Sequence, residues 1–408
     1  MKEDRLLNVL SNVDSKYIEE ADPEVHAKVK TPIWIKGVAI AACACLILGS
    51  ILFLFSQNKK PSMDTPKLPV LTLPENNEED MGYEGYMAYD ISELTNGNPW
   101  HEGVALKTLP VYKNTLTNDE NGIAAGADWD KMEKMLYDVA ARLGIKKEEL
   151  TVTDDTPDEE EQVRIKEKFN AVEQEIPKGY FEPTMLIGRA NGIVIRVSQT
   201  MTASVEFQPS VELPADYSFS NYCSYEDMLL SAEYLKVKYK NLIDMDKPIA
   251  DICSGDYDIY KRQHFNLNFF DGSGDQTEQI INYNFCTVSF YPDDNGQLCM
   301  ASVSERDLSQ KVGDYPIISA DDAKKLLSNG NYTTTVPYEL PGMEYVKKVE
   351  LIYRHDIHDE YYIPYYRFLV ELPKEKQEND MKTYGAYYVP AVKEAYISNM
   401  PLWDGNFN

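Results

Sequence analysis

The sequence predicts an α+β protein in which one transmembrane helix carries extracellular domains of helices packed on antiparallel sheets. Three observations lead to this fold class. Residues 37–55 form an uncharged apolar run, the helix signals beyond it are each followed by strand-like segments, and the chain contains 29 tyrosines. Helices followed by runs of strands indicate an α+β architecture rather than a doubly wound parallel sheet. Clustered aromatic residues are typical of half-buried strands.

The apolar run 37–55 is predicted to be a retained membrane anchor. As a helix it is roughly 28 Å long at about 1.5 Å per residue, enough to cross a bilayer core of about 30 Å. A cleaved signal peptide would open with a short basic segment, whereas a long mixed segment precedes this run. A buried core helix would normally show a polar face. Cys43 and the three residues before it resemble a lipidation site, but most of the apolar run follows that cysteine, so lipidation is the less favoured alternative.

The segment before the anchor, residues 1–36, is predicted to be a cytoplasmic tail with a short amphipathic helix. Leu6, Leu10, Val13 and Tyr17 recur at spacings of three and four, which places them on one helix face. These four residues are the predicted binding site for a cytoplasmic protein partner, whose binding would have to order so short a helix. The alternative is a weakly ordered tail that rests on the membrane surface.

The charges that flank the anchor do not decide its orientation. Equal numbers of lysines lie close to its two ends, namely Lys28, Lys30 and Lys36 before it and Lys59, Lys60 and Lys67 after it. Because the positive-inside count is therefore close to a tie, the expected topology depends on the family resemblance described below.

The composition limits the partners of the large domain. The chain has 408 residues and a formal net charge of −27. Nucleic acid and anionic lipid both require a basic surface, so neither is an expected partner. Metal cations, basic peptides and cell-wall polymers remain compatible with this charge, although solubility alone explains it most simply.

Beyond the anchor the chain is predicted to form a linker and two domains. Four prolines and an acidic end make residues 56–80 an extended linker. Residues 81–215 are the predicted first α+β domain, and residues 216–408 are the predicted second one. Two domains agree with the length that remains after the tail and the anchor.

The first domain contains a helix and a hairpin. Apolar residues at helical spacing predict a helix over residues 128–143, with Asp128 as its N-cap and Gly144 after its end. Asn191-Gly192 between two apolar runs predicts a hairpin of residues 185–190 and 193–197. A third strand is expected over residues 204–208.

The second domain contains two capped helices and several strands. Ser224 and Ser319, each followed three residues later by an aspartate, predict helices over 224–240 and 319–327. Aromatic and β-branched residues predict the strands, which are 257–260, 265–270, 283–291, 346–353, 361–372 and 384–392. Turns are expected at 271–275 and 293–296.

Four cysteines fall in the large domain, and their spacing indicates no metal site. Cys223, Cys253, Cys286 and Cys299 form no CxxC pair, so zinc binding and dithiol chemistry lack support. Disulfides stay open as an alternative outside the cell, but buried free thiols are the favoured interpretation.

No motif in the chain predicts catalysis or a cofactor. His355 and His358 stand among carboxylates but also fit a polar hairpin loop, and Asp271 and Asp275 begin a calcium-type loop that lacks its glycine and its distal glutamate. HExxH, GxSxG, Walker and GxGxxG motifs do not occur. The sequence therefore predicts no enzyme, no metal site and no cofactor.

Parts of the chain resemble cell-envelope proteins of clostridia and related Firmicutes. The resemblance rests on residues 312–327, 349–353, 363–368 and 387–392. Their order of one helix followed by strands is also similar to PepSY and YcdB-like modules of secreted regulators and peptidase propeptides. Residues 12–21 are similar to tails that precede a membrane helix in the same bacterial group, some of which are described as anti-sigma-factor-like.

The resemblance implies a topology and two alternative functions. It places the N-terminus in the cytoplasm and the large domain outside the cell membrane. The first expectation is an extracellular sensing or binding protein that regulates a cytoplasmic partner such as a sigma factor, with an unidentified ligand. The alternative is an envelope interaction or peptidase-inhibitory module without signalling. The tail contains His26 and no cysteine, so the zinc-binding set of one anti-sigma class is absent.

Overall fold

The computed structural model describes residues 68–74, 83–118, 124–125, 128–177, 179–355, 359–376 and 380–407. Leu68–Asn408 form one compact unit. The predicted tail with Leu6, Leu10, Val13 and Tyr17, the predicted membrane helix 37–55 and the first part of the predicted linker lie outside the described residues. Within the described ranges, no helix combines the length and the apolar character needed to cross a membrane.

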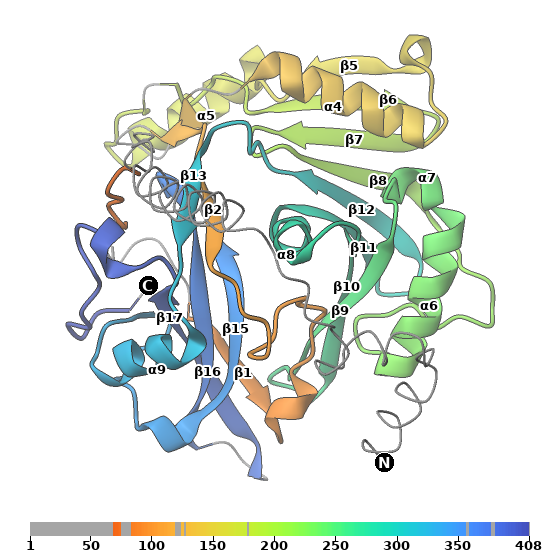
Figure 1. Ribbon diagram of the computed structural model, residues 1–408. Helices are drawn as coiled ribbons and strands as arrows, with labels where there is room; N and C mark the ends of the chain where they lie inside the picture. Colours follow the sequence, from red (N-terminus) through yellow and green to blue (C-terminus); the bar gives the residue numbers. More distant parts are fainter. Residues whose placement is uncertain are drawn as a thin grey trace, which may run out of the picture. The chain divides into compact units, whose positions relative to one another are not determined.

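The predicted α+β class is confirmed, and its largest element is an eight-stranded antiparallel sheet (Figure 1). Its strands, in spatial order, are β5 (Thr151–Asp154), β6 (Met185–Ala190), β7 (Ile193–Ser198), β8 (Thr202–Val211), β12 (Leu298–Glu305), β11 (Cys286–Pro292), β10 (Gln263–Asp271) and β9 (Pro248–Tyr257). Most neighbours in the sheet are also consecutive along the chain, with α5 between β5 and β6 and α8 between β10 and β11, whereas β8 pairs with the distant β12. That pairing joins segments about 90 residues apart in one sheet, at a cost in loop-closure entropy that grows slowly with length.

Three helices cover one face of this sheet, which we call the outer face. They are α4 (Trp129–Arg142), α6 (Tyr225–Lys238) and α7 (Lys240–Ile243). Alternate residues of the strands point toward them and form an apolar core that includes Leu136, Val205, Leu235, Phe269 and Val303. Because strand side chains alternate between faces, the remaining alternate residues point to the opposite face, which we call the inner face.

A second sheet of seven strands lies on the inner side of the first one (Figure 1). Its strands are β1 (Gly85–Ala88), β17 (Lys382–Pro390), β16 (Tyr361–Lys376), β2 (Thr108–Lys113), β13 (Lys311–Pro316), β14 (Thr333–Thr334) and β15 (Val346–Arg354). Helix α9 (Ala320–Ser328) packs on this sheet through Ala323 and Leu327. Helix α8 (Gln276–Phe285) contacts β10, β11 and β15 and therefore lies between the two sheets.

The smaller elements connect these layers. They are the strand pair β3 (Thr117–Asn118) and β4 (Ala124–Ala125), helix α5 (Glu159–Ala171), and the 3₁₀ turns η1 (Ile91–Glu93), η2 (Lys147–Glu149), η3 (Met343–Tyr345) and η5 (Glu394–Tyr396). Helix α5 contains no buried residue. The polar sequence of α5 agrees with that exposure, since it lacks an apolar stripe.

The local sequence signals predicted several of the larger elements correctly. Asp128, Ser224 and Ser319 are the N-caps of α4, α6 and α9, and each side chain accepts a backbone N–H three residues later. Asn191 and Gly192 have φ angles of 51° and 76° and join β6 to β7, as expected for a two-residue hairpin turn. The predicted strands 265–270, 346–353, 361–372 and 384–392 coincide with β10, β15, β16 and β17.

Two strand predictions are confirmed only in part. Residues 286–291 lie in β11, as expected. Residues 283–291 begin inside helix α8, because Asp275 and Glu278 form a capping box that starts a helix before the aromatic strand. Tyr257 ends β9, and residues 258–260 belong to the turn that follows, where the Asp258 carboxylate accepts the N–H groups of Tyr260 and Arg262. The real strand β9 precedes that turn.

The expected domain limits also need correction. The division into 81–215 and 216–408 does not match the structure, since β8 and β12 from the two predicted domains pair in one sheet and Leu68–Asn408 form one unit. Part of the predicted linker 56–80 is folded as well. Leu71 is buried and forms a parallel bridge with Ile397, which the apolar residues between the prolines explain.

Candidate functional site

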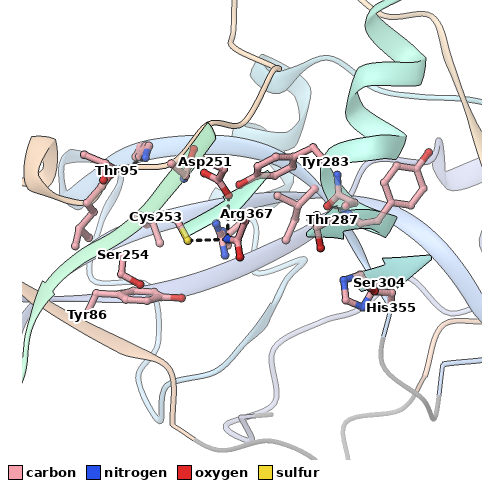
Figure 2. A pocket seen from close by; sticks show the side chains of 18 of the residues that line it. Tyr86, Thr95, Asp251, Cys253, Ser254, Tyr283, Thr287, Ser304, His355 and Arg367 are labelled. Atoms are coloured by element: carbon pink, nitrogen blue, oxygen red, sulfur yellow. Dashed lines mark hydrogen bonds between the residues drawn. The ribbon is translucent and has the colours of Figure 1, made fainter. Parts of the chain in front are cut away.

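A cavity with a volume of about 430 Å³ lies between the two sheets. We call it the chamber. Its walls come from β9 to β12 on one side and from β1, β15 and β16 on the other, with α8 and the segment 94–96 between them. Figure 2 shows Tyr86 and Ser254 at one end and Ser304 and His355 at the other. Elements separated by hundreds of residues thus meet in one cavity.

The chamber is polar because it is built from the inner face of the eight-stranded sheet. Asp251 and Cys253 of β9 alternate with the core residue Ile252, and Asn268 of β10 alternates with the core residue Phe269. The wall of the seven-stranded sheet follows the same rule. Arg367 and Leu369 face the chamber, whereas Phe368 packs in the core with α9. Because successive side chains of a strand point to opposite faces, one set of residues packs in the core and the alternate set lines the chamber.

Hydrogen bonds fix the side chains on the β9 to β11 wall. Asn268 lies opposite both Asp251 and Ser289 in the strand register. Its amide donates to Asp251 Oδ2 at 3.3 Å and to Cys253 Sγ at 3.2 Å, while its oxygen accepts from Ser289 Oγ at 2.6 Å. Gly97 N–H donates to Asp251 Oδ1 at 2.5 Å. Asp251 and Ser289 are only 5% and 8% exposed, so this wall is rigid and preorganised.

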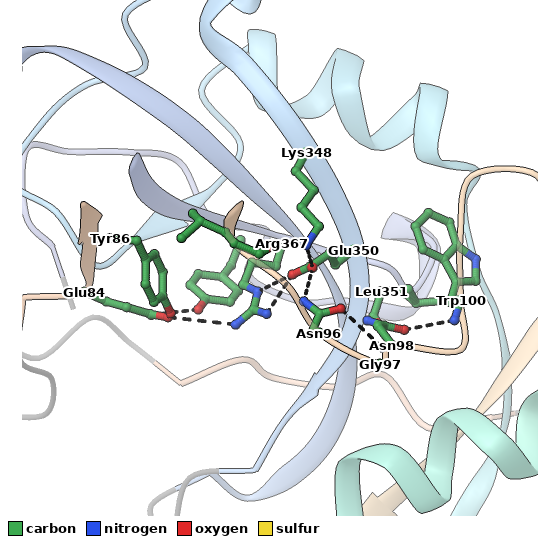
Figure 3. A network of polar contacts seen from close by, with 12 residues as sticks. Glu84, Tyr86, Asn96, Gly97, Asn98, Trp100, Lys348, Glu350, Leu351 and Arg367 are labelled. Carbon is green, nitrogen blue, oxygen red and sulfur yellow. Dashed lines mark hydrogen bonds and ion pairs between the residues drawn. The ribbon is translucent and has the colours of Figure 1, made fainter. Parts of the chain in front are cut away.

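A network of charges forms the opposite wall (Figure 3). Arg367 donates twice to Glu350 Oε2, from Nε at 2.9 Å and from a terminal nitrogen at 2.7 Å. Lys348 Nζ lies 2.9 Å from Glu350 Oε1 and also donates to Leu94 O at 2.8 Å. Asn96 Nδ2 donates to the same Glu350 oxygen. Glu350 is 3% exposed, and its charge is balanced by two cations.

Burial and neighbouring charges shift the pKa values of Glu350 and Asp251, one on each wall, in opposite directions. Burial raises the pKa of Glu350, but the charges of Arg367 and Lys348 outweigh it and hold the pKa at about 2. Burial raises the pKa of Asp251, and its hydrogen bonds from Gly97 and Asn268 do not offset that effect. The neighbouring charge of Glu350 raises it further. Groups with such opposed shifts gather at functional sites more often than elsewhere.

The Cys253 thiol and the Tyr86 and Tyr283 hydroxyls of the chamber stay protonated at neutral pH. Burial raises the pKa of the Cys253 thiol to about 12. Burial also raises the pKa of the Tyr86 and Tyr283 hydroxyls. Tyr86 donates to Glu84, which also accepts from Tyr388 and lies 3.9 Å from Arg367. The chamber therefore offers neutral hydroxyl, thiol and amide groups beside a balanced ion network, an arrangement suited to hydrogen-bonding a ligand.

Backbone strain marks one edge of the chamber. Ser254 has a φ angle of 82°, which a residue with a Cβ seldom adopts, and Gly255 follows with the same value. A Cβ on Gly255 would lie 1.9 Å from the carbonyl oxygen of Glu93, so only glycine allows this close approach. Ser254 O accepts from Thr95 N–H at 3.1 Å. Strain held by such contacts is often found at ligand sites.

The structure brings only some of the sequence candidates to this site. His355 lines the chamber, whereas His358 lies outside the described residues. Asp271 accepts backbone N–H groups of Asp246, Lys247 and Ser273, and Asp275 caps α8, so both carboxylates have structural partners. In the described part of the chain, no three His, Cys, Asp or Glu side chains are grouped as metal ligands. The four tail residues lie outside it.

The four cysteines of the large domain are free thiols, as expected from the sequence, but they are half-buried rather than buried. Cys253 is the one that the chamber includes. Burial raises the pKa of Cys286 to about 11 and also raises the pKa of Cys223 and Cys299. Their thiols are therefore protonated and weakly nucleophilic at neutral pH.

Most residues of the chamber were missed by sequence reasoning. Arg367, Glu350 and Asp251 each lie between two apolar neighbours in a strand, and each resembled an ordinary solvent-facing position. One signal was present in the sequence. Ser302 and Ser304 alternate with Ala301 and Val303 in β12, and a strand with small hydroxyl residues on one face and core residues on the other indicates a polar but sheltered surface.

Comparison with known proteins adds no identification. Neither a model of a protein family nor a curated protein sequence matches this chain.

Proposed function

We propose that this protein is a membrane-anchored sensing protein whose large extracellular domain binds a small polar ligand or polar group in the chamber. The topology and the anchor come from the sequence, through the run 37–55 and the resemblance to envelope proteins. The relay to a cytoplasmic partner, such as a sigma factor, would use Leu6, Leu10, Val13 and Tyr17.

The observation that carries the proposal is the polar chamber between the sheets. A volume of about 430 Å³ falls within the range of about 300–1,000 Å³ that is usual for small-molecule sites. Asn268 and Ser289 are held by neighbouring side chains, so binding would require little further ordering of them. An interior with a purely structural role would be filled with apolar side chains, because a buried polar group stabilises a fold only when it is well paired.

Placement of the chamber between two sheets also suits a sensor. Lys348 of β15 bonds to the carbonyl of Leu94, and Thr95 bonds to β9 through Ile252 O. The segment 94–96 therefore connects both walls. If the two walls can adopt two relative positions, a ligand that contacts both walls shifts the equilibrium between those positions only when it binds one of them more tightly.

Ligand binding is tested on the full chain in detergent by thermal unfolding. The probes are N-acetylglucosamine, glycine and glycerol phosphate, chosen as a neutral sugar, a zwitterion and an anion. At 100 times its Kd, a ligand stabilises the folded state by about 2.7 kcal/mol, which raises Tm measurably. We expect one probe to raise Tm of the wild type and of the control Thr151→Val, whose hydroxyl is exposed on β5.

Asn268→Leu removes the central hydrogen-bonding group of the β10 wall and should abolish that rise in Tm. An equal rise in this variant places the probe elsewhere, and a flat response to all three probes contradicts the chamber as a small-ligand site.

The relay is tested separately by transcript profiles of cells that carry single variants. We expect Leu6→Asp with Leu10→Asp to change the same transcripts as Asn268→Leu, because both interrupt one path. Transcripts that respond to neither variant would leave a binding protein without signalling.

A further inference from the structure

The polar wall of the chamber continues across the inner face of the eight-stranded sheet. Asp251, Asn268 and Ser289 lie opposite one another on β9, β10 and β11. Ser289 lies opposite Ser302 on β12, and Ser302 lies opposite Ser204 on β8.

The register places one more residue beyond Ser204, namely Arg196 on β7. Six adjacent strands thus contribute one polar residue each to a single line, which we call the polar row. Ile187 of β6 lies opposite Arg196 and ends it.

A second line of hydroxyl groups runs beside the polar row, one pleat away. Ser198, Thr202, Ser304 and Thr287 lie opposite one another on β7, β8, β12 and β11. The hydroxyls of Thr202 and Ser304 are 3.4 Å apart. Since Thr287 and Ser304 line the chamber, this second line connects the chamber to the part of the inner face on β8 and β7.

The outer part of the polar row is partly exposed. Ser204, Ser302 and Arg196 are neither buried nor fully exposed, whereas Asp251 and Ser289 are buried. Arg196 pairs with Glu206 of β8, so its charge is balanced. The row therefore leads from a buried end in the chamber to a partly exposed end on β7.

The chemistry of this surface favours a neutral ligand rich in hydroxyl groups. Serine, threonine and asparagine side chains both donate and accept hydrogen bonds, as sugar hydroxyls require. The cations Arg196, Lys348 and Arg367 are each paired with a glutamate. A net charge of −27 for the chain opposes polyanions.

A peptide chain would use a different part of a sheet. It adds to an exposed strand edge through main-chain hydrogen bonds and fits side chains into pockets. The polar row instead lies on the face of a sheet, in the middle of paired strands. An acyl chain would need an apolar lining, which Ser204, Ser302 and Ser289 do not provide.

The length of the row points to an extended ligand. Six adjacent strands span roughly 24 Å, as five steps of about 4.8 Å. One sugar unit fills only a part of that distance. Tyr86 and Tyr283 at the chamber end provide aromatic rings beside the hydrogen-bonding groups.

We infer that the chamber and the polar row together bind a neutral, hydroxyl-rich glycan chain, with its end in the chamber and several further units along the inner face. The inference rests on the proposed function, because it assigns the ligand of the same site. Binding strength should therefore increase with chain length until the row is filled.

The test measures affinity for N-acetylglucosamine oligomers of one to six units by calorimetry, with the full chain in detergent. Cello-oligomers of the same lengths form a second arm that lacks the acetamido group. We expect the pentamer to bind at least about tenfold more tightly than the dimer in one of the two arms, since each added unit gains hydrogen bonds.

Two variants locate the extra units. Ser302→Val and Ser204→Val lie outside the chamber and should reduce the affinity for the pentamer to about that for the dimer, with the dimer unchanged. Thr151→Val on the edge strand β5 should leave the whole length series unchanged. A circular dichroism melt of each variant confirms that it is folded.

The outcomes separate this inference from the proposed function. Affinity that does not depend on chain length, or a pentamer affinity that survives both serine variants, overturns the glycan row while the chamber stays a small-ligand site. If no oligomer binds but glycine or glycerol phosphate binds in a way that depends on Asn268, the glycan row is likewise overturned and the chamber stays a small-ligand site. Failure of all probes overturns both.

Discussion

The two faces of the eight-stranded sheet differ in chemistry although the same strands build them. In β12, Ala301 and Val303 are almost fully buried against the helices of the outer face. Ser302 and Ser304 alternate with them on the inner face and are partly exposed. The difference shows that one strand contributes alternate residues to a stable core and to a hydrogen-bonding surface. Substitutions can therefore change the core and the surface independently.

The outer face carries most of the stabilisation. Fully burying one large apolar side chain contributes about 1.5–3 kcal/mol, and this core contains residues from all three helices and most strands. A hydroxyl that is partly exposed contributes little, because its water hydrogen bonds are only exchanged. The following predictions use this contrast, from the largest expected effect to the smallest.

Truncation on the outer face should have the largest effect. Phe269→Ala removes a side chain that is 0% exposed and contacts the ring of Phe290. We expect the free energy of unfolding to fall by about 3–5 kcal/mol because a cavity remains, as measured by urea unfolding of the full chain. Val237→Ala on the exposed side of α6 is the control and should have little effect. A loss below about 1 kcal/mol would contradict a packed outer core.

Breaking the ion network should have the next largest effect, and it should depend on pH. Glu350→Gln leaves Arg367 and Lys348 without their shared anion, at a cost of about 3 kcal/mol near neutral pH. The folded pKa of Glu350, about 2, lies below its ordinary 4.5. Its stabilisation is therefore complete above pH 4.5 and is lost as the pH falls toward 2.

Urea unfolding of wild type and Glu350→Gln across that interval measures the effect. The difference between the two proteins should shrink as the solution becomes more acidic. A difference that is constant between about pH 5 and about pH 2.5 would show that the network does not depend on the ionised carboxylate.

Two neighbouring residues of β8 test the contrast between faces directly. Ala203 is 0% exposed on the outer face, and Ser204 is partly exposed on the inner face. Ala203→Ser buries a new hydroxyl without a partner and should destabilise by about 1–3 kcal/mol. Ser204→Ala should stay within about 0.5 kcal/mol. Equal losses in thermal unfolding would mean that the inner face is packed like the outer one.

The substitution Asp251→Asn should change the free energy of unfolding by less than Glu350→Gln does, and with the opposite pH dependence. The folded pKa of Asp251 is raised above 3.8 by burial, so the folded state binds more protons than the unfolded state just above pH 3.8. Stability then falls as the pH rises through that region and stays lower above the folded pKa. Asp251→Asn removes this fall, so the stability of the variant relative to wild type should rise between about pH 3.5 and about pH 7. A constant difference would refute the raised pKa.

Local signals explain which elements the sequence predicted well. The caps at Asp128, Ser224 and Ser319 and the turn at Asn191-Gly192 depend on residues a few positions apart, and such signals are independent of the tertiary fold. Helix α8 was missed because its aromatic residues before Cys286 also suit a strand. The capping box of Asp275 and Glu278 determined its start.

The chamber required contacts that no local pattern contains. Tyr86 and Arg367 lie nearly three hundred residues apart in the chain, and the β8–β12 pairing that creates the inner face crosses the expected domain boundary. The alternating serines of β12 were the one sequence signal of a polar inner face. Asp251 and Glu350 look alike in sequence, and only their neighbours separate a raised pKa from a lowered one.

The central claim is that the inner face of the sheet is the binding face, and hydroxyl-radical footprinting of side chains tests it most directly. The full chain is oxidised with and without the N-acetylglucosamine pentamer. Met300 and Tyr283 on the inner side should be protected by the glycan, while Tyr225 and Leu229 on α6 should be oxidised equally in both samples. Protection of the α6 residues, or equal oxidation of Met300 and Tyr283 in both samples, would contradict it.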